Sequence, residues 1–213
     1  MRLMHVDSSP KGERSISRSL SQFFSDQLRE RIEGISIDYL DLSRDVPQHV
    51  TGAFAQATYT PVAKRTPEMR RVLASSDALC ARLLVADALL FAMPMYNWSM
   101  PSSFKAFIDA IVRTDLTYGT TSDGRLEGRL GGKKVLFITT RGADLQLGSP
   151  FAEMDALTPA LRAAFGFLGV SEPRFVDAQP VEFAAAEARS KALERARREL
   201  REIAEEWSSA RSV

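Results

Sequence analysis

The chain has 213 residues, of which 45% are hydrophobic and 26% charged, and its net charge is +1 at pH 7. This composition suits a soluble globular protein with a large core, and a charge so close to neutral argues against nucleic-acid binding by bulk electrostatics. No apolar run is long enough to cross a bilayer, the start Met1–Val6 leaves no room for a signal peptide, and the single cysteine, Cys80, excludes an internal disulfide; we therefore expect a cytoplasmic protein without a membrane partner.

Strand and helix patterns alternate along the chain. The expected strands are Arg2–Val6, Ile35–Leu40, Ala88–Met93, Lys133–Thr140 and Arg174–Ala178. The expected helices are Arg14–Arg31, Pro67–Ala86, Pro101–Arg113 and Ala184–Trp207, with a short helix near Gly52–Ala57 and a mostly helical segment at Pro150–Leu168. A turn signal at Ser122–Gly124 predicts a hairpin excursion over residues 114–131.

Five strands with helices between them predict an α/β fold, a doubly wound parallel sheet with helices on both faces. We interpret residues 1–213 as a single domain, because no repeat, linker or low-complexity segment divides the sequence. Two strand orders are common in such sheets, the Rossmann type and the flavodoxin-like type. The sequence carries neither G-x-G-x-x-G after the first strand nor a P-loop, so classical dinucleotide and P-loop interpretations lose their main support.

The loop after the first expected strand is rich in hydroxyl groups. It contains Ser8, Ser9, Ser15 and Ser17, and the last two lie at the start of the first helix. Free backbone N–H groups and the helix dipole favour an anion there, so the loop could hold a phosphate without a lysine. The alternative is that these serines only cap a turn and a helix.

The segment after the third expected strand is the most specific in the chain. The apolar run Ala88–Met93 predicts a strand buried on both faces, and it breaks at Pro94. A loop of aromatic and amide side chains, Met95–Trp98, then leads to Pro101 and an apolar-periodic helix. Loops at the carboxyl ends of parallel strands bind ligands, and this one suits a flat ring with polar edges.

A third loop, Thr139–Asp144, follows the fourth expected strand. Gly142 would let the backbone approach a ligand closely, and Arg141 could pair with an anionic edge or with a surface carboxylate. The three loops should converge on one edge of the sheet. A phosphate end at the first and a ring at the other two describe a mononucleotide such as FMN.

The chain resembles the FMN-dependent NADH:azoreductases, a family of flavodoxin-like quinone reductases. Ser8–Ser17 is similar to the family's S-S…S-x-S phosphate loop, and Met93–Trp98 to its P-M-Y-N-F/W flavin loop. Gly132–Lys134 followed by Thr140–Ala143 resembles its G-K-K…S/T-R-G-G segment, and Phe165–Gly169 its F-x-G-F-L/I-G stretch. The likeness covers nearly the whole chain, with a departure at Ala143, where the family usually has a second glycine.

The resemblance implies a flavodoxin-like five-stranded sheet in the order 2-1-3-4-5, bound FMN, and NADH or NADPH as the donor. It implies two-electron, ping-pong hydride transfer to quinones and azo compounds in a homodimer, with no catalytic side chain because the flavin carries the chemistry. The FMN-binding residues that it implies are Ser9, Ser15, Ile16, Ser17, Met95, Tyr96, Asn97, Trp98, Thr140, Arg141, Gly142 and Ala143. Tyr118, in the expected hairpin, either stacks on a planar substrate across the dimer interface or is a cross-strand or core tyrosine.

Two other functions remain open from the sequence. One is a flavodoxin-like electron carrier or FMN-binding module without its own organic substrate; the near-neutral charge and the excursion over residues 114–131 disfavour it. The other is a phosphodiesterase acting on an acyl carrier protein, which needs a metal site or an activated nucleophile. The isolated histidines His5 and His49 predict no metal site, His5 being expected in the core and His49 in solvent.

Overall fold

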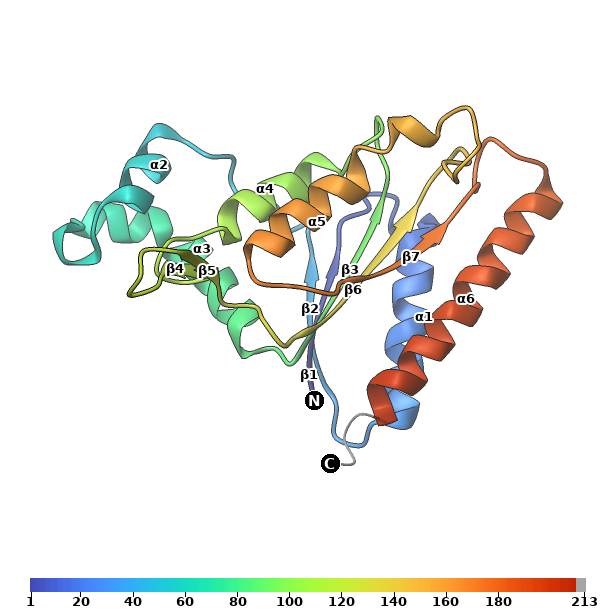
Figure 1. Ribbon diagram of the computed structural model, residues 1–213, viewed down its shortest axis with the longest axis horizontal. Helices are drawn as coiled ribbons and strands as arrows, with labels where there is room; N and C mark the ends of the chain where they lie inside the picture. The colour runs from blue at the N-terminus through green and yellow to red at the C-terminus, as the bar shows by residue number, and fades with distance from the viewer. Residues whose placement is uncertain (210–213) are drawn as a thin grey trace.

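The computed structural model describes residues 1–209 as an α/β fold around a five-stranded sheet (Figure 1), and it confirms the predicted fold class. All neighbouring strands of this sheet run parallel, in the order β2-β1-β3-β6-β7. The predicted order, 2-1-3-4-5, differs in detail because two short strands, β4 and β5, precede the fourth strand of the sheet. The strands are β1 (Arg2–Asp7), β2 (Ser36–Asp41), β3 (Ala88–Pro94), β6 (Lys134–Thr140) and β7 (Arg174–Ala178).

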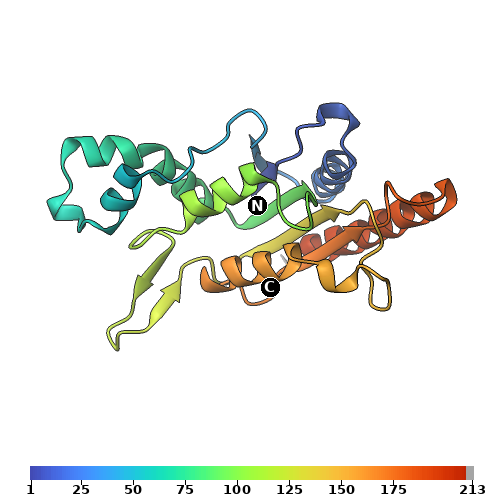
Figure 2. The same cartoon turned by 90° about the horizontal axis from the view of Figure 1, so that it is seen from above.

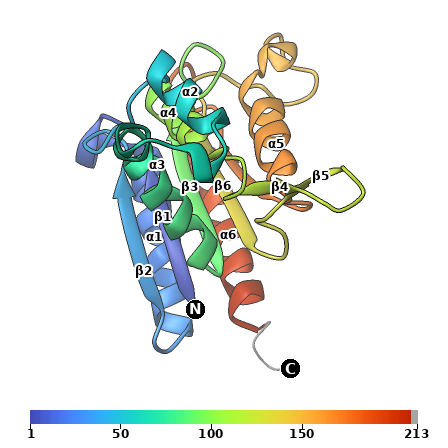
Figure 3. The same ribbon diagram turned by 90° about the vertical axis from the view of Figure 1, so that its left-hand side faces the viewer.

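Helices cover both faces of the sheet. One face carries α1 (Ile16–Arg31) and α6 (Ala186–Ser209), which pack together, and the other carries α3 (Pro67–Val85), α4 (Ser102–Ile111) and α5 (Leu157–Phe167) (Figure 1). The short helix α2 (Gly52–Tyr59) packs on α3 beyond the edge of the sheet (Figures 1 and 3). The alternating chain thus produces the three layers that its hydrophobic periods predict.

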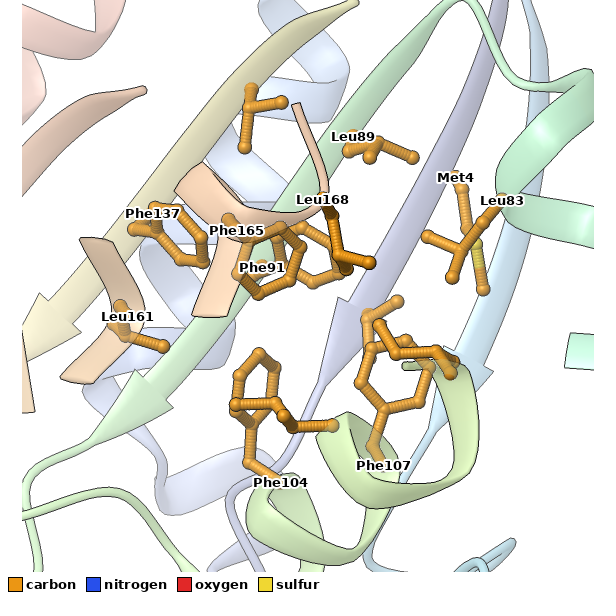
Figure 4. Close-up of a cluster of buried hydrophobic side chains, with 14 of the residues drawn as sticks. Met4, Leu83, Leu89, Phe91, Phe104, Phe107, Phe137, Leu161, Phe165 and Leu168 are labelled. Carbon is orange, nitrogen blue, oxygen red and sulfur yellow. The ribbon is translucent and has the colours of Figure 1, made fainter. Parts of the chain in front are cut away.

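The central strand β3 explains why the run Ala88–Met93 is apolar throughout. Every residue of this run is fully buried, because helices cover both faces of the strand. Leu89, Phe91 and Met93 enter the core beneath α3, α4 and α5, whereas the alternate residues enter the core beneath α1 and α6. Figure 4 shows Phe91 at the centre of a cluster of aromatic rings that includes Phe104, 5.6 Å away between ring centroids.

The helix α5 forms most of the segment Pro150–Leu168, which the sequence predicts to be mostly helical. Before it, residues 150–156 form a loop with one short turn of 3-10 helix, Ala152–Met154. The carboxylate of Asp155 accepts hydrogen bonds at 3.0 Å from the backbone N–H groups of Leu157 and Thr158. This side chain satisfies the free amides of the first turn and so fixes the start of the helix.

Between β3 and β6 the chain leaves the sheet. Strands β4 (Tyr118–Thr120) and β5 (Leu126–Gly128) pair antiparallel within the segment 114–131, and this hairpin projects away from the sheet (Figures 2 and 3). Among residues 1–209, no helix is long and apolar enough to cross a membrane.

The single cysteine lies in α3. Cys80 is fully buried, its Sγ lies 3.7 Å from the carbonyl oxygen of Ile111, and burial raises the pKa of its thiol to about 11. It packs as a small apolar residue of the core, as predicted.

Candidate functional site

The carboxyl ends of β1, β3 and β6 lie side by side, because the register pairs Asp7 with Ala92 and Pro94 with Thr140. The loops that follow these three strands therefore meet at one edge of the sheet. This is the edge at which open α/β sheets bind ligands.

The first loop, residues 8–15, buries its serine side chains. Ser8, Ser9, Ser15 and Ser17 are all buried, and Ser8 is tied to β3 by its backbone N–H, which donates to the Ala92 carbonyl at 3.0 Å. Ser15 is the N-cap of α1: its Oγ accepts from the backbone N–H of Arg18 at 3.3 Å and lies 3.1 Å from the Oγ of Ser17. Ser15 therefore caps the helix, which is one of the two roles that the sequence predicts for the serines. Its hydroxyl also lies beside the helix N-terminus, where free amides attract anions.

The second loop turns sharply. Tyr96 and Ser99 exchange backbone hydrogen bonds of 2.9 and 3.0 Å, and the residues between them, Asn97 and Trp98, have φ values of 47° and 69°. Asparagine tolerates this left-handed conformation, but tryptophan rarely adopts it, so the turn holds local backbone strain. Such strain concentrates at functional sites.

Two contacts hold the strained turn in place. The backbone N–H of Ala156 donates to the Trp98 carbonyl at 3.0 Å, and the Trp98 ring lies 5.6 Å from the Phe151 ring. At the start of the loop, the backbone N–H of Met95 donates to the Thr140 carbonyl at 2.8 Å. The second loop is therefore fixed to the last residue of β6 and to the segment before α5.

In the third loop, the Arg141 side chain points away from solvent. Its guanidinium lies 3.2 Å from a carboxylate oxygen of Asp155 and 3.3 Å from one of Asp177, and it donates to the Thr158 hydroxyl at 2.6 Å. Its backbone N–H and carbonyl are also both hydrogen-bonded, to Ala178 and Val181. The sequence predicts that Arg141 pairs either with an anionic edge of a ligand or with a surface carboxylate, and in the structure it pairs with the carboxylates of Asp155 and Asp177.

The next residue, Gly142, permits a close approach. Its carbonyl accepts from the backbone N–H groups of Glu182 and Phe183, at 3.2 and 2.9 Å. A Cβ atom at Gly142 would lie 2.9 Å from Cε2 of Phe183, so only glycine leaves the ring its present place. The segment after β7 is thereby brought to the edge of the sheet.

The second and third loops line an open cavity of about 1040 Å³. Six of the residues expected at the ring site line it, namely Met95, Tyr96, Asn97, Trp98, Gly142 and Ala143. Residues 144–151 and Phe183 complete the lining, and of these only Asp144 lies in a loop that the sequence predicts at the site. Phe151 and Phe183 are 42% and 84% exposed, and partly exposed aromatic side chains around a cavity indicate a binding site for an apolar, flat ligand.

Other predicted residues lie outside this lining among the described residues. Thr140 and Arg141 are buried beneath the third loop and do not line the cavity. The serines Ser9, Ser15 and Ser17 lie with Ile16 around the N-terminus of α1. Tyr118 lies in β4, where its hydroxyl is 2.5 Å from that of Thr114 and its ring is 4.8 Å from the Phe167 ring. Phe183 carried no sequence signal, because its place depends on hydrogen bonds to a loop about 40 residues earlier in the chain.

Comparisons with known proteins agree with this arrangement. A family model described as "Flavodoxin-like fold" matches residues 1–204. The chain is 41% identical over 213 residues to the FMN-dependent NADH:quinone oxidoreductase 1 of Trichormus variabilis, with all of both chains covered. It is 37% identical to the FMN-dependent NADH:quinone oxidoreductase of Nostoc sp., covering 96% of this chain and 99% of the relative.

A solved structure extends the comparison to the fold. The FMN-dependent NADH-azoreductase from Bacillus anthracis, in complex with FMN, superimposes with a TM-score of 0.85. The match covers 97% of this chain and 99% of the other at 22% sequence identity, so it is evidence for a shared fold.

Proposed function

The chain belongs to the flavodoxin-like fold family, and on that premise we propose that it is an FMN-dependent NADH:quinone oxidoreductase. One observation carries the proposal: a cavity lined by Met95–Trp98 and by the loop after β6 opens at the same sheet edge as a loop of buried serines. A ring site and an anion site at that edge match the two ends of a flavin mononucleotide.

The first loop has the donors that a phosphate needs. Ser9, Ser15 and Ser17 bring buried hydroxyl groups to the N-terminus of α1, and the amides of Ile16 and Ser17 lie in its first turn, where N–H groups have no acceptor within the helix. These four residues would hold the phosphate group of FMN. The helix dipole would add a favourable field at the same place.

The cavity would hold the flavin ring. Met95–Trp98 would line one edge of the flavin, with the turn at Asn97 presenting backbone groups, and Gly142 and Ala143 would meet another part of it. Thr140 and Arg141 would act by holding the loops, since the Thr140 carbonyl binds Met95 and the Arg141 guanidinium binds Asp155 and Asp177.

When bound, FMN would supply the redox chemistry, which moves a hydride from NADH or NADPH to a quinone or an azo compound. The protein then needs no catalytic side chain of its own. Its aromatic residues at the cavity, Trp98, Phe151 and Phe183, would give a planar acceptor a flat apolar surface and exclude water.

We also propose that residues 1–213 form a single domain, that the protein is a cytoplasmic homodimer, and that Tyr118 contacts a planar acceptor across the dimer interface. The projecting hairpin β4–β5 supports the last point, because Tyr118 lies on it beside the 41%-exposed ring of Phe167. The single cysteine suits a reducing compartment.

The names of the relatives do not favour the two alternatives, the electron carrier and the phosphodiesterase. The phosphodiesterase also leaves the aromatic side chains at the cavity without a role.

The experiment is the visible absorption spectrum of the purified protein, recorded without oxygen before and after NADH is added. We expect a flavin spectrum that bleaches with NADH and recovers when a quinone follows. A flavin spectrum that NADH leaves unchanged would favour the electron carrier. A colourless protein that takes up no added FMN would overturn the proposal.

A further inference from the structure

Arg18 joins the two ends of the loop of buried serines. Its Nε and Nη2 lie 2.9 and 2.6 Å from the carbonyl oxygen of Ser9, where the loop begins, and both donate to it. Its backbone N–H donates to the Ser15 hydroxyl, where the loop ends. One residue thus fixes the backbone of Ser9 and the side chain of Ser15 relative to α1.

A second set of contacts fixes the Arg18 side chain itself. Its Nη2 lies 2.5 Å from a carboxylate oxygen of Asp41 and 3.0 Å from the Ser43 hydroxyl, at the end of β2. Its Nη1 donates at 2.8 Å to the hydroxyl of Tyr39, which donates at 2.9 Å to the buried carboxylate of Asp7. The guanidinium is therefore held by two neighbouring strands and cannot reorient without breaking several hydrogen bonds.

The pKa shifts of Asp41 and Tyr39 have the directions expected for groups in this network. Burial alone would raise the pKa of Asp41, but hydrogen bonds from Arg18 and Ser43 outweigh it and lower that pKa. Burial and the nearby charge of Asp7 raise the pKa of the Tyr39 hydroxyl to about 12, so Tyr39 stays a donor at neutral pH.

The role of Arg18 is geometric, because carboxylates already balance its charge. Asp41 lies at 2.5 Å and Asp7 at 3.7 Å from the guanidinium, so little of the positive charge is left for an anion bound in the loop. What the guanidinium supplies is a planar fork that reaches the Ser9 carbonyl, Asp41 and Tyr39 at once. A lysine, with one nitrogen, cannot replace that fork.

We infer that Arg18 is a positioning residue for the phosphate end of the flavin: by holding the Ser9 carbonyl to α1 and β2, it presets the serine loop in the form that receives the phosphate. This inference rests on the proposed function. It differs from a direct ligand contact, since all three guanidinium nitrogens of Arg18 are already engaged by protein acceptors: the Ser9 carbonyl, Tyr39, Asp41 and Ser43.

The test compares FMN with riboflavin, which has the same ring but no phosphate. Dissociation constants are measured by fluorescence titration of the flavin-free protein, for wild type, Arg18→Gln and Arg18→Lys. We expect both variants to raise the FMN dissociation constant by about tenfold, because a displaced serine loop would lose about one hydrogen bond to the charged phosphate. The riboflavin dissociation constant should rise by less than about twofold.

Arg82→Gln is the matched control. Arg82 forms a similar forked pair with Asp38 at 2.8 and 2.7 Å and also donates to the Tyr39 carbonyl, but it lies on α3. We expect this variant to leave the ratio of the two dissociation constants unchanged, which separates a local effect on the loop from a general loss of ion pairs at β2.

The outcomes are distinct. A wild-type protein that binds no FMN overturns the proposed function, and this inference with it. A wild-type protein that binds FMN, with Arg18 variants that weaken FMN and riboflavin equally or neither, overturns the inference alone. Arg18→Lys binding FMN as wild type does would assign the effect to charge and would also overturn it; this variant keeps a cation beside Asp41 and so remains testable if Arg18→Gln does not fold.

Discussion

Gly142 and Phe183 approach each other more closely than any side chain at position 142 would allow. A Cβ atom added there would lie 2.9 Å from Cε2 and 3.1 Å from Cδ2 of the Phe183 ring. The backbone of Phe183 is fixed by its hydrogen bond to the Gly142 carbonyl, but its ring is mostly exposed. A substitution at Gly142 therefore moves the ring and leaves the backbone in place.

Gly142→Ala should change the cavity and spare the fold. We expect the free energy of unfolding to change by less than about 0.5 kcal/mol, because the exposed ring can swing away. The displaced ring should alter the KM for a quinone. Denaturant unfolding and steady-state kinetics measure the two effects.

Gly128→Ala provides the contrast. Its Cβ would lie 1.9 Å from the backbone carbon of Leu168, which cannot swing away, so we expect a loss of about 3 kcal/mol. Equal effects on unfolding from the two substitutions would contradict the assignment of Phe183 as the part that yields.

Asn97→Asp should weaken FMN binding. Asn97 lines the cavity, and a carboxylate there would place negative charge beside the carbonyl oxygens at the edge of the flavin ring. We expect the FMN dissociation constant to rise by about tenfold, the effect of one unfavourable charge contact. The same titration of Asn97→Gly isolates the charge, since glycine keeps the positive φ of 47° without strain. An unchanged FMN affinity in Asn97→Asp would remove Asn97 from the ring site.

Arg141→Gln should destabilise the fold more than it affects the ligand. The substitution leaves the Asp155 and Asp177 carboxylates without their shared partner, and breaking a buried ion pair costs about 3 kcal/mol. We expect a lower free energy of unfolding and an FMN dissociation constant near that of wild type at temperatures where the variant is folded.

The surface pair of Arg174 and Glu206 supplies the control for that loss. Both side chains are about half exposed, so Arg174→Gln should cost less than about 1 kcal/mol. If Arg141→Gln were as stable as Arg174→Gln but bound FMN poorly, the Arg141 side chain would belong to the ligand site.

Asp41→Asn should reduce stability in a pH-dependent manner. The pKa of Asp41 is lowered in the folded protein, so its ionised form stabilises the fold above the unfolded-state pKa, and this contribution is lost as the pH falls through the folded-state pKa. We expect a difference of about 1–2 kcal/mol from wild type at pH 7 that disappears as the pH falls from about 4 toward 2. Urea unfolding across that range measures it, and a difference that persists at low pH would contradict the ionic origin.

The elements that the sequence predicts well are those with a local cause. Ala88–Met93 is apolar at every position because β3 is buried on both faces, and Thr66 with Pro67 marks the start of α3, where the Thr66 hydroxyl accepts from the backbone N–H of Met69. The segment Pro150–Leu168, predicted to be mostly helical, becomes α-helical only at Leu157, because the apolar residues around Phe151 face a cavity and not a helix seam.

In the candidate site, too, the parts with a local sequence pattern are the ones that can be predicted. Met95–Trp98 can be found from the strand that precedes it, whereas Phe183 reaches the cavity through hydrogen bonds with Gly142, and no local pattern encodes that contact. The role of Arg18 could not be predicted from the sequence, because its partners Tyr39 and Asp41 lie in β2, more than 20 residues away along the chain.

The burial of Cys80 makes the protein convenient for site-directed labelling. Its thiol is fully buried and stays protonated at neutral pH, so maleimide reagents should leave it unmodified, and no second native cysteine competes. A cysteine introduced at the exposed position 147, on the cavity wall, would then be the one reactive thiol. A fluorophore attached there would report the filling of the cavity directly, without relying on turnover.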